Sequence, residues 1–87
     1  MKRSLLSPTE SEHVFLLLGY PLRLSTAEAA YLHAMIACDS LSTVHLSARD
    51  AKMLAAKLCS INKKAYRISG RRLILLLDGV YRLNPDL

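Results

Sequence analysis

The apolar residues of the chain follow helical spacing in three stretches, and each stretch begins with the same local device. A serine is followed three residues later by an acid at Ser7 and Glu10, at Ser25 and Glu28, and at Ser47 and Asp50. In such a capping box the serine hydroxyl accepts from a free backbone N–H of the first helical turn, and the acid reaches back to the serine N–H. The pattern predicts helices over residues 8–18, 26–37 and 48–66.

The ends of the first helix are predicted from the residues that follow it. Gly19 accepts a positive φ and Pro21 cannot continue a helix, so we expect the helix to end at Leu18. Its buried face should hold Val14, Leu17 and Leu18. In the second helix the inward positions are expected to be Ala29, Leu32, Met35 and Ile36. Residues 43–46 are expected to form a short extended piece.

The third helix is followed by a change to alternating spacing. Asp78 and Gly79 separate two apolar runs, and an Asp-Gly pair between such runs is a strong signal for a β-hairpin, here over residues 71–83. Both faces of this hairpin are apolar, so one should cover the helices and the other needs more sheet, another chain or a second domain. The candidate interface residues are Leu75, Leu77 and Val80.

The element order predicts an α+β fold that is mainly helical. Three helices followed by a C-terminal β-hairpin form the layout of a winged helix-turn-helix. Residues 1–87 are expected to make up one such domain, because the chain is short for anything larger.

The outward side of helix 48–66 is predicted to be basic. Its centre holds the small residues Ala56 and Ser60, which would let the helix approach base edges in a major groove, while the cations at its ends meet phosphates. The candidate DNA-binding residues of this helix and the hairpin are Arg49, Lys52, Ala56, Lys57, Ser60, Lys63, Lys64, Arg67, Arg71, Arg72 and Arg82. The competing interpretation is an ordinary solvated charged face.

Charge arithmetic sharpens this prediction. The 87 residues carry a formal net charge of +5. Residues 1–44 hold three cations against four acids, whereas residues 45–87 hold nine against three. A basic half joined to a slightly acidic one favours a surface that faces a polyanion.

Several function classes are excluded by the same sequence. No apolar run approaches the ~20 residues that span a bilayer, and no apolar segment follows the N-terminal cations as in a secretory signal, so a cytoplasmic protein without membrane contact is expected. Cys38 and Cys59 are expected to be reduced thiols. There is no phosphate-binding glycine loop, nucleophile elbow, paired carboxylates or metal-ligand spacing, so we expect no catalytic residues, no metal, no cofactor and no enzyme activity.

The motifs also show a resemblance to a known family. The starts at Leu6–Glu10 and Leu24–Glu28, the helix end at Lys57–Ala65, and the segments Gly70–Ile74 and Gly79–Leu83 together resemble the winged-helix effector domain of OmpR/PhoB-class bacterial response regulators. The resemblance implies sequence-specific binding of double-stranded DNA, with helix 48–66 in the major groove. The chain is expected to depart from the family in lacking the receiver domain and most of the N-terminal sheet, because only about six residues precede the first predicted helix. The family usually carries an arginine near the wing tip, where this chain has Leu76, Leu77 and Asp78.

Two functions follow from these patterns. The first is a DNA-binding transcriptional regulator module. The alternative is a protein-interaction or dimerisation module on the same fold, with a homodimer or a regulatory protein as partner and weak or no DNA binding. The leucine-rich hairpin and the lack of a cation at its tip favour the alternative.

Overall fold

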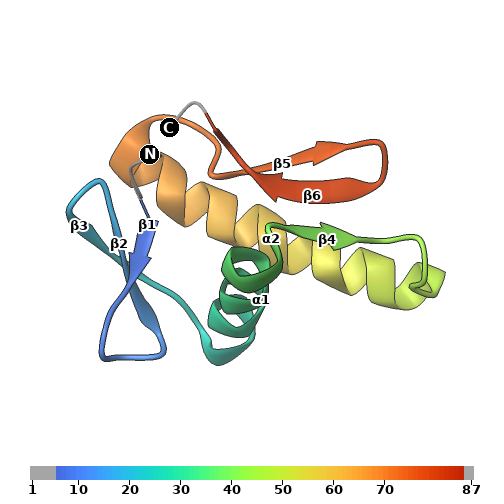
Figure 1. Ribbon diagram of the computed structural model, residues 1–87, viewed down its shortest axis with the longest axis horizontal. Coiled ribbons are helices and arrows are strands. Elements are labelled where there is room, and N and C mark those ends of the chain that lie inside the picture. Colours follow the sequence, from blue (N-terminus) through green and yellow to red (C-terminus); the bar gives the residue numbers. More distant parts are fainter. Residues whose placement is uncertain (1–5, 86–87) are drawn as a thin grey trace.

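The computed structural model describes residues 6–85 as two helices and six strands, with the strands in two antiparallel three-stranded sheets. The N-terminal sheet places β1 (Leu6–Pro8), β2 (Val14–Leu17) and β3 (Tyr20–Arg23) in chain order. The C-terminal sheet has the order β4 (Ser40–Ser42), β6 (Val80–Leu83), β5 (Ile74–Leu77). The helices are α1 (Thr26–Cys38) and α2 (Ala48–Ser69). Figure 1 shows the N-terminal sheet at one end of the helix pair and the β5–β6 hairpin running along α2.

The predicted fold class was wrong, because the helix expected over residues 8–18 does not form. The structure has two helices and two sheets in place of three helices and a C-terminal hairpin. Thr9 does not lie in the first turn of a helix. Its hydroxyl accepts from the Ser11 N–H at 3.2 Å and donates to the Val14 carbonyl at 2.7 Å, which closes the loop between β1 and β2. The expectation that most of an N-terminal sheet is absent is therefore also wrong.

The residues taken for a helix end form a tight turn between β2 and β3. Leu18 has φ 53° and Gly19 has φ 83°, and two successive positive values are the mark of a type I′ hairpin turn. Phe15 and Leu17 on β2 are fully buried, whereas Leu18 is exposed and Val14 half-buried. Pro21 lies on β3, an edge strand, where a missing N–H costs no ladder bond. Of the burial predicted for this segment, only that of Leu17 is confirmed.

The other two helices are confirmed. α1 carries a complete capping box: the Ser25 N–H donates to Glu28 Oε1 at 2.8 Å and the Glu28 N–H donates to Ser25 Oγ at 3.3 Å. α2 has half of one, in which Ser47 Oγ accepts from the Asp50 N–H at 3.1 Å. α2 runs three residues beyond the predicted end at residue 66 and stops at Gly70, whose φ of 72° makes a left-handed C-cap.

The hairpin is confirmed, but its first strand begins at Ile74 and not at residue 71, and β4 joins it as a third strand. Asp78 and Gly79 have φ values of 52° and 76°, again a type I′ turn. The extended piece expected over residues 43–46 lies earlier, at Ser40–Ser42. Thr43 instead fastens the turn, since its N–H and its hydroxyl both donate to the Gly79 carbonyl, at 3.0 and 2.8 Å.

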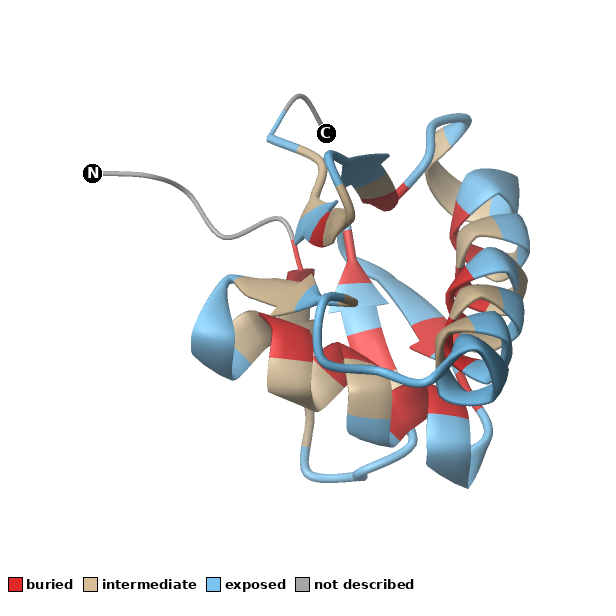
Figure 2. Cartoon of the chain, turned by 90° about the vertical axis from the view of Figure 1, so that its right-hand side faces the viewer, coloured by how far each residue is buried: buried red, intermediate tan, exposed pale blue. Residues whose placement is uncertain are grey.

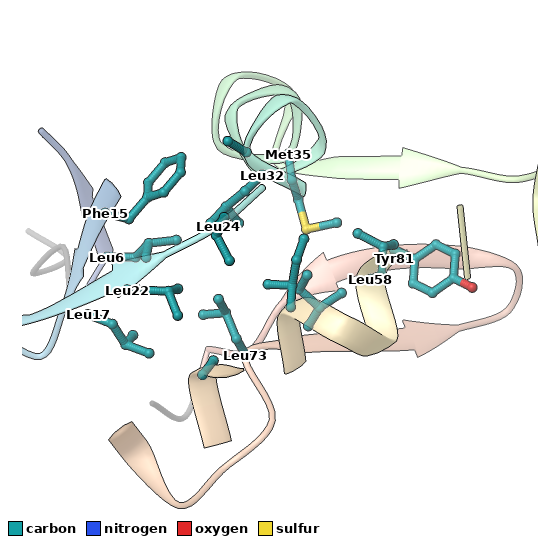
Figure 3. Close-up of a cluster of buried hydrophobic side chains, with 14 of the residues drawn as sticks. Leu6, Phe15, Leu17, Leu22, Leu24, Leu32, Met35, Leu58, Leu73 and Tyr81 are labelled. Carbon is teal, nitrogen blue, oxygen red and sulfur yellow. The ribbon is translucent and has the colours of Figure 1, made fainter. Parts of the chain in front are cut away.

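A single cluster of buried side chains connects both sheets to both helices. Phe15, Leu17 and Leu22 from the N-terminal sheet point toward α1 and the C-terminal segment, where Leu32 and Leu73 meet them (Figure 3). Burial of this kind contributes roughly 25 cal/mol per Å² of apolar surface removed from water. The N-terminal sheet is thus part of the core that holds α2 in place.

Candidate nucleic-acid interface

Helix α2 presents one buried and one exposed side along its whole length. Leu54, Leu58, Ile61 and Ala65 recur at intervals of three and four residues and are buried. The opposite side is exposed and carries Arg49, Lys52, Ala56, Lys63 and Arg67, which we call the outer face of α2. Figure 2 shows the buried positions of the helices gathered on their inner sides, with exposed positions outward.

The outer face of α2 is long and carries its cations toward its two ends. At ~1.5 Å per residue, the 18 intervals between Arg49 and Arg67 extend over about 27 Å. Ala56 lies near the middle and directly opposite the buried row, so only a short side chain projects from the centre of the face. The cations lie toward its two ends. The exposed acid Asp50 lies in the first turn of α2.

Two of the predicted contact residues, Lys64 and Ser60, face Glu28 on α1 instead. Lys64 Nζ is 2.5 Å from Glu28 Oε1, and the Glu28 side chain is 3% exposed. Burial alone would raise the pKa of Glu28. Hydrogen bonds from Lys64, the Ser25 backbone and the hydroxyls of Ser60 and Ser25 outweigh burial and lower that pKa to about 2. The carboxylate therefore stays ionised, and Lys64 joins α2 to α1.

The remaining predicted cations are spread over different surfaces. Lys57 is half-buried on α2, whereas Arg71 and Arg72 are exposed in the segment between α2 and β5. Arg82 pairs with Leu75 on β5 and Ser40 on β4, on the face of the C-terminal sheet that points away from the helices. The structure thus brings together Arg49, Lys52, Ala56, Lys63 and Arg67. It leaves Lys57, Arg71, Arg72 and Arg82 outside this group.

The three predicted partner residues do share a surface. Leu75, Leu77 and Val80 alternate with the buried Ile74 and Tyr81, so they lie on the outer face of the C-terminal sheet. Leu77 is 61% exposed, while the other two are half-buried.

No family model, curated protein or solved structure matches this chain. The resemblance to response-regulator effector domains therefore remains a hypothesis that rests on the sequence motifs alone.

Within residues 6–85, no group of three or more His, Cys, Asp or Glu side chains is placed to hold a metal ion. Cys38 and Cys59 are free and exposed. Neither α1 nor α2 is long and apolar enough to cross a membrane.

Sequence reasoning missed a groove between α2 and the hairpin. Its volume is about 410 Å³, and its lining residues are Ala55, Leu58, Cys59, Asn62, Lys63, Tyr66, Arg72, Ile74, Leu76 and Tyr81. The side chain of Asn62 bonds twice to β5, donating to the Ile74 carbonyl at 3.0 Å and accepting from the Ile74 N–H at 2.8 Å. The helical period could have placed Ala55, Asn62 and Tyr66 on one flank, but not opposite a strand.

Proposed function

We propose that this protein binds double-stranded DNA through the outer face of α2. The observation that carries the proposal is the row of four exposed cations, Arg49, Lys52, Lys63 and Arg67, on the side of one helix that points away from the core. The major groove admits an α-helix, and cations at the two ends of that helix can meet phosphates on the groove walls.

The placement of the acids supports the proposal. Glu28 is neutralised by Lys64, and its burial keeps its charge from the surface. The outer face therefore keeps an excess of positive charge, with Asp50 as its acidic neighbour on the helix. Phosphate contacts of this type supply most of the affinity of non-specific DNA binding and make that affinity depend on salt.

A salt titration with matched charge variants tests the proposal. Fluorescence anisotropy with a labelled 20-base-pair duplex should give a log-log slope of affinity against salt of about −3 to −4, because each phosphate contact contributes about −0.9. Lys52→Glu with Lys63→Glu should lower the affinity by at least about 100-fold.

The control carries the same change in net charge elsewhere. Arg23→Glu with Arg82→Glu places the charges on β3 and on the outer face of the C-terminal sheet, where both arginines are exposed. This double variant should lower the DNA affinity by less than about tenfold. Equal losses in the two double variants would show that α2 is not the contact surface, and an affinity independent of salt would end the proposal.

A second candidate function is self-association through the C-terminal sheet. The shared outward position of the exposed Leu77 and the half-buried Leu75 and Val80 favours it, since contiguous apolar surface marks interaction sites. Sedimentation velocity over a concentration series should show a dimer that Leu77→Glu removes. A sedimentation coefficient that does not change with concentration would rule the dimer out.

A further inference from the structure

The groove between α2 and β5 has an apolar floor and a basic rim. The side chains of Leu58, Ile74 and Tyr81 form the buried floor. The exposed side chains of Lys63, Tyr66 and Arg72 lie around it, and Leu76, 54% exposed, extends the apolar lining. None of the lining residues, all within residues 6–85, is acidic.

The strand that borders this groove is the edge of its sheet. β5 pairs with β6 on one side only, and the Asn84 N–H donates to the Leu73 carbonyl at 2.7 Å. Because hydrogen-bonding direction alternates along a strand, Leu73, Leu75 and Leu77 turn their backbone groups toward β6, and Ile74 and Leu76 turn theirs outward.

Asn62 covers the outward groups of Ile74, as its side-chain amide bonds to both of them. The next outward groups, those of Leu76, have no partner among residues 6–85. An edge strand with free backbone groups is a template for pairing with another segment. Asn62 limits that pairing to the half of β5 next to the hairpin turn.

The positive charge at the rim of the groove indicates which kind of ligand it binds. Lys63 and Arg72 are exposed, and no ion pair links either side chain to another residue of the part of the chain that the structure describes. A segment that lies in the groove would place apolar side chains on its floor and needs carboxylates to match these two cations. A DNA duplex fits the site poorly, because its phosphates gain nothing from an apolar floor.

We propose that this groove binds a short peptide segment of a partner protein that combines large apolar side chains with acidic ones. The segment lies between α2 and β5, with an apolar side chain against Leu58 and Tyr81 and a carboxylate at Lys63 and Arg72. The groove flanks the outer face of α2 and shares Lys63 with it, so peptide and DNA compete for one cation. The proposal does not depend on DNA binding and extends beyond it.

Selection from a random dodecapeptide library displayed on phage tests the proposal with the intact chain. Enriched sequences should combine acidic with large apolar residues, and synthetic copies should bind the unaltered protein in a fluorescence anisotropy assay. Leu76→Glu should weaken this binding at least tenfold, since it removes apolar lining and repels acids.

The chain offers a closely matched control. Leu77 is the neighbouring residue with a similar exposure, 61% against 54%, but it lies on the opposite face of the sheet. Leu77→Glu should therefore change peptide affinity less than twofold, and Arg72→Glu should weaken it at least fivefold. All three positions are exposed, so thermal unfolding should remain close to that of the unaltered protein.

Three results would overturn the proposal. They are a library that yields no binders, binders without acidic residues, or equal losses with Leu76→Glu and Leu77→Glu. A DNA affinity that falls with Leu76→Glu but not with Lys52→Glu would assign the groove to nucleic acid instead. DNA binding is judged on Lys52 and peptide binding on Leu76, so either proposal can fail without the other.

Discussion

The carboxylate of Glu28 caps one helix and pairs with the other at the same time. It accepts from the Ser25 N–H at 2.8 Å and lies 2.5 Å from Lys64 Nζ. A buried charge is costly unless it is paired and hydrogen-bonded, and here both conditions hold. This contact fixes the start of α1 against the C-terminal third of α2, so it also fixes the direction in which the outer face of α2 points.

The lowered pKa of Glu28 predicts an acid-sensitive part of the stability. The pKa falls from an ordinary value of 4.5 to about 2 on folding, so the stabilisation is complete above pH 4.5 and is lost as the pH falls toward 2. Its size is at most about 3 kcal/mol, since one pKa unit corresponds to about 1.4 kcal/mol. Urea unfolding at pH 7, 4.5 and 3 measures it.

The variant Glu28→Gln supplies the control for this prediction. Glutamine keeps an oxygen that can cap α1 but loses the charge that pairs with Lys64. We expect a loss of about 1–3 kcal/mol at pH 7 and a weaker dependence of stability on pH below 4.5. An unchanged acid dependence in this variant would show that other carboxylates cause it.

At the scale of elements, the length of a pattern decides how well it predicts structure. α2 covers 22 residues, so its apolar residues repeat over about six turns and specify both helix and buried side. The segment at Val14–Leu17 is four residues long, and its apolar run fits a helix or a strand equally well. The Ser7–Glu10 box and the Gly19 stop signal then favoured the wrong choice.

The first segment forms strands because β2 pairs with a strand on each side and packs against residues that are distant in sequence. β2 lies between β1 and β3 and buries Phe15 and Leu17 against α1 and the C-terminal segment. Pro8 and Pro21, taken as a helix start and a helix stop, lie instead on the two edge strands of the sheet. Local capping signals cannot report such tertiary pairing, and for this reason they misled here.

At the scale of the whole molecule, the two candidate surfaces differed in how far they could be predicted. The outer face of α2 belongs to one helix, so helical period and charge were enough to propose its exposed cations. The ion pair of Lys64 with Glu28 and the outward face of Arg82 depend on other elements and were not foreseen. The groove needs α2 and β5 side by side, a juxtaposition that no local pattern contains.

The central claim is that the outer face of α2 is the DNA-contacting surface of the molecule. The most direct measurement is a titration of the ¹⁵N-labelled protein with a 16-base-pair duplex, followed by amide chemical shifts. We predict that the largest shifts fall on Lys52, Ala56, Lys63 and Arg67, while the amides of β1–β3 move little. Shifts centred on the N-terminal sheet or on the outer face of the C-terminal sheet, with α2 unchanged, would contradict the claim.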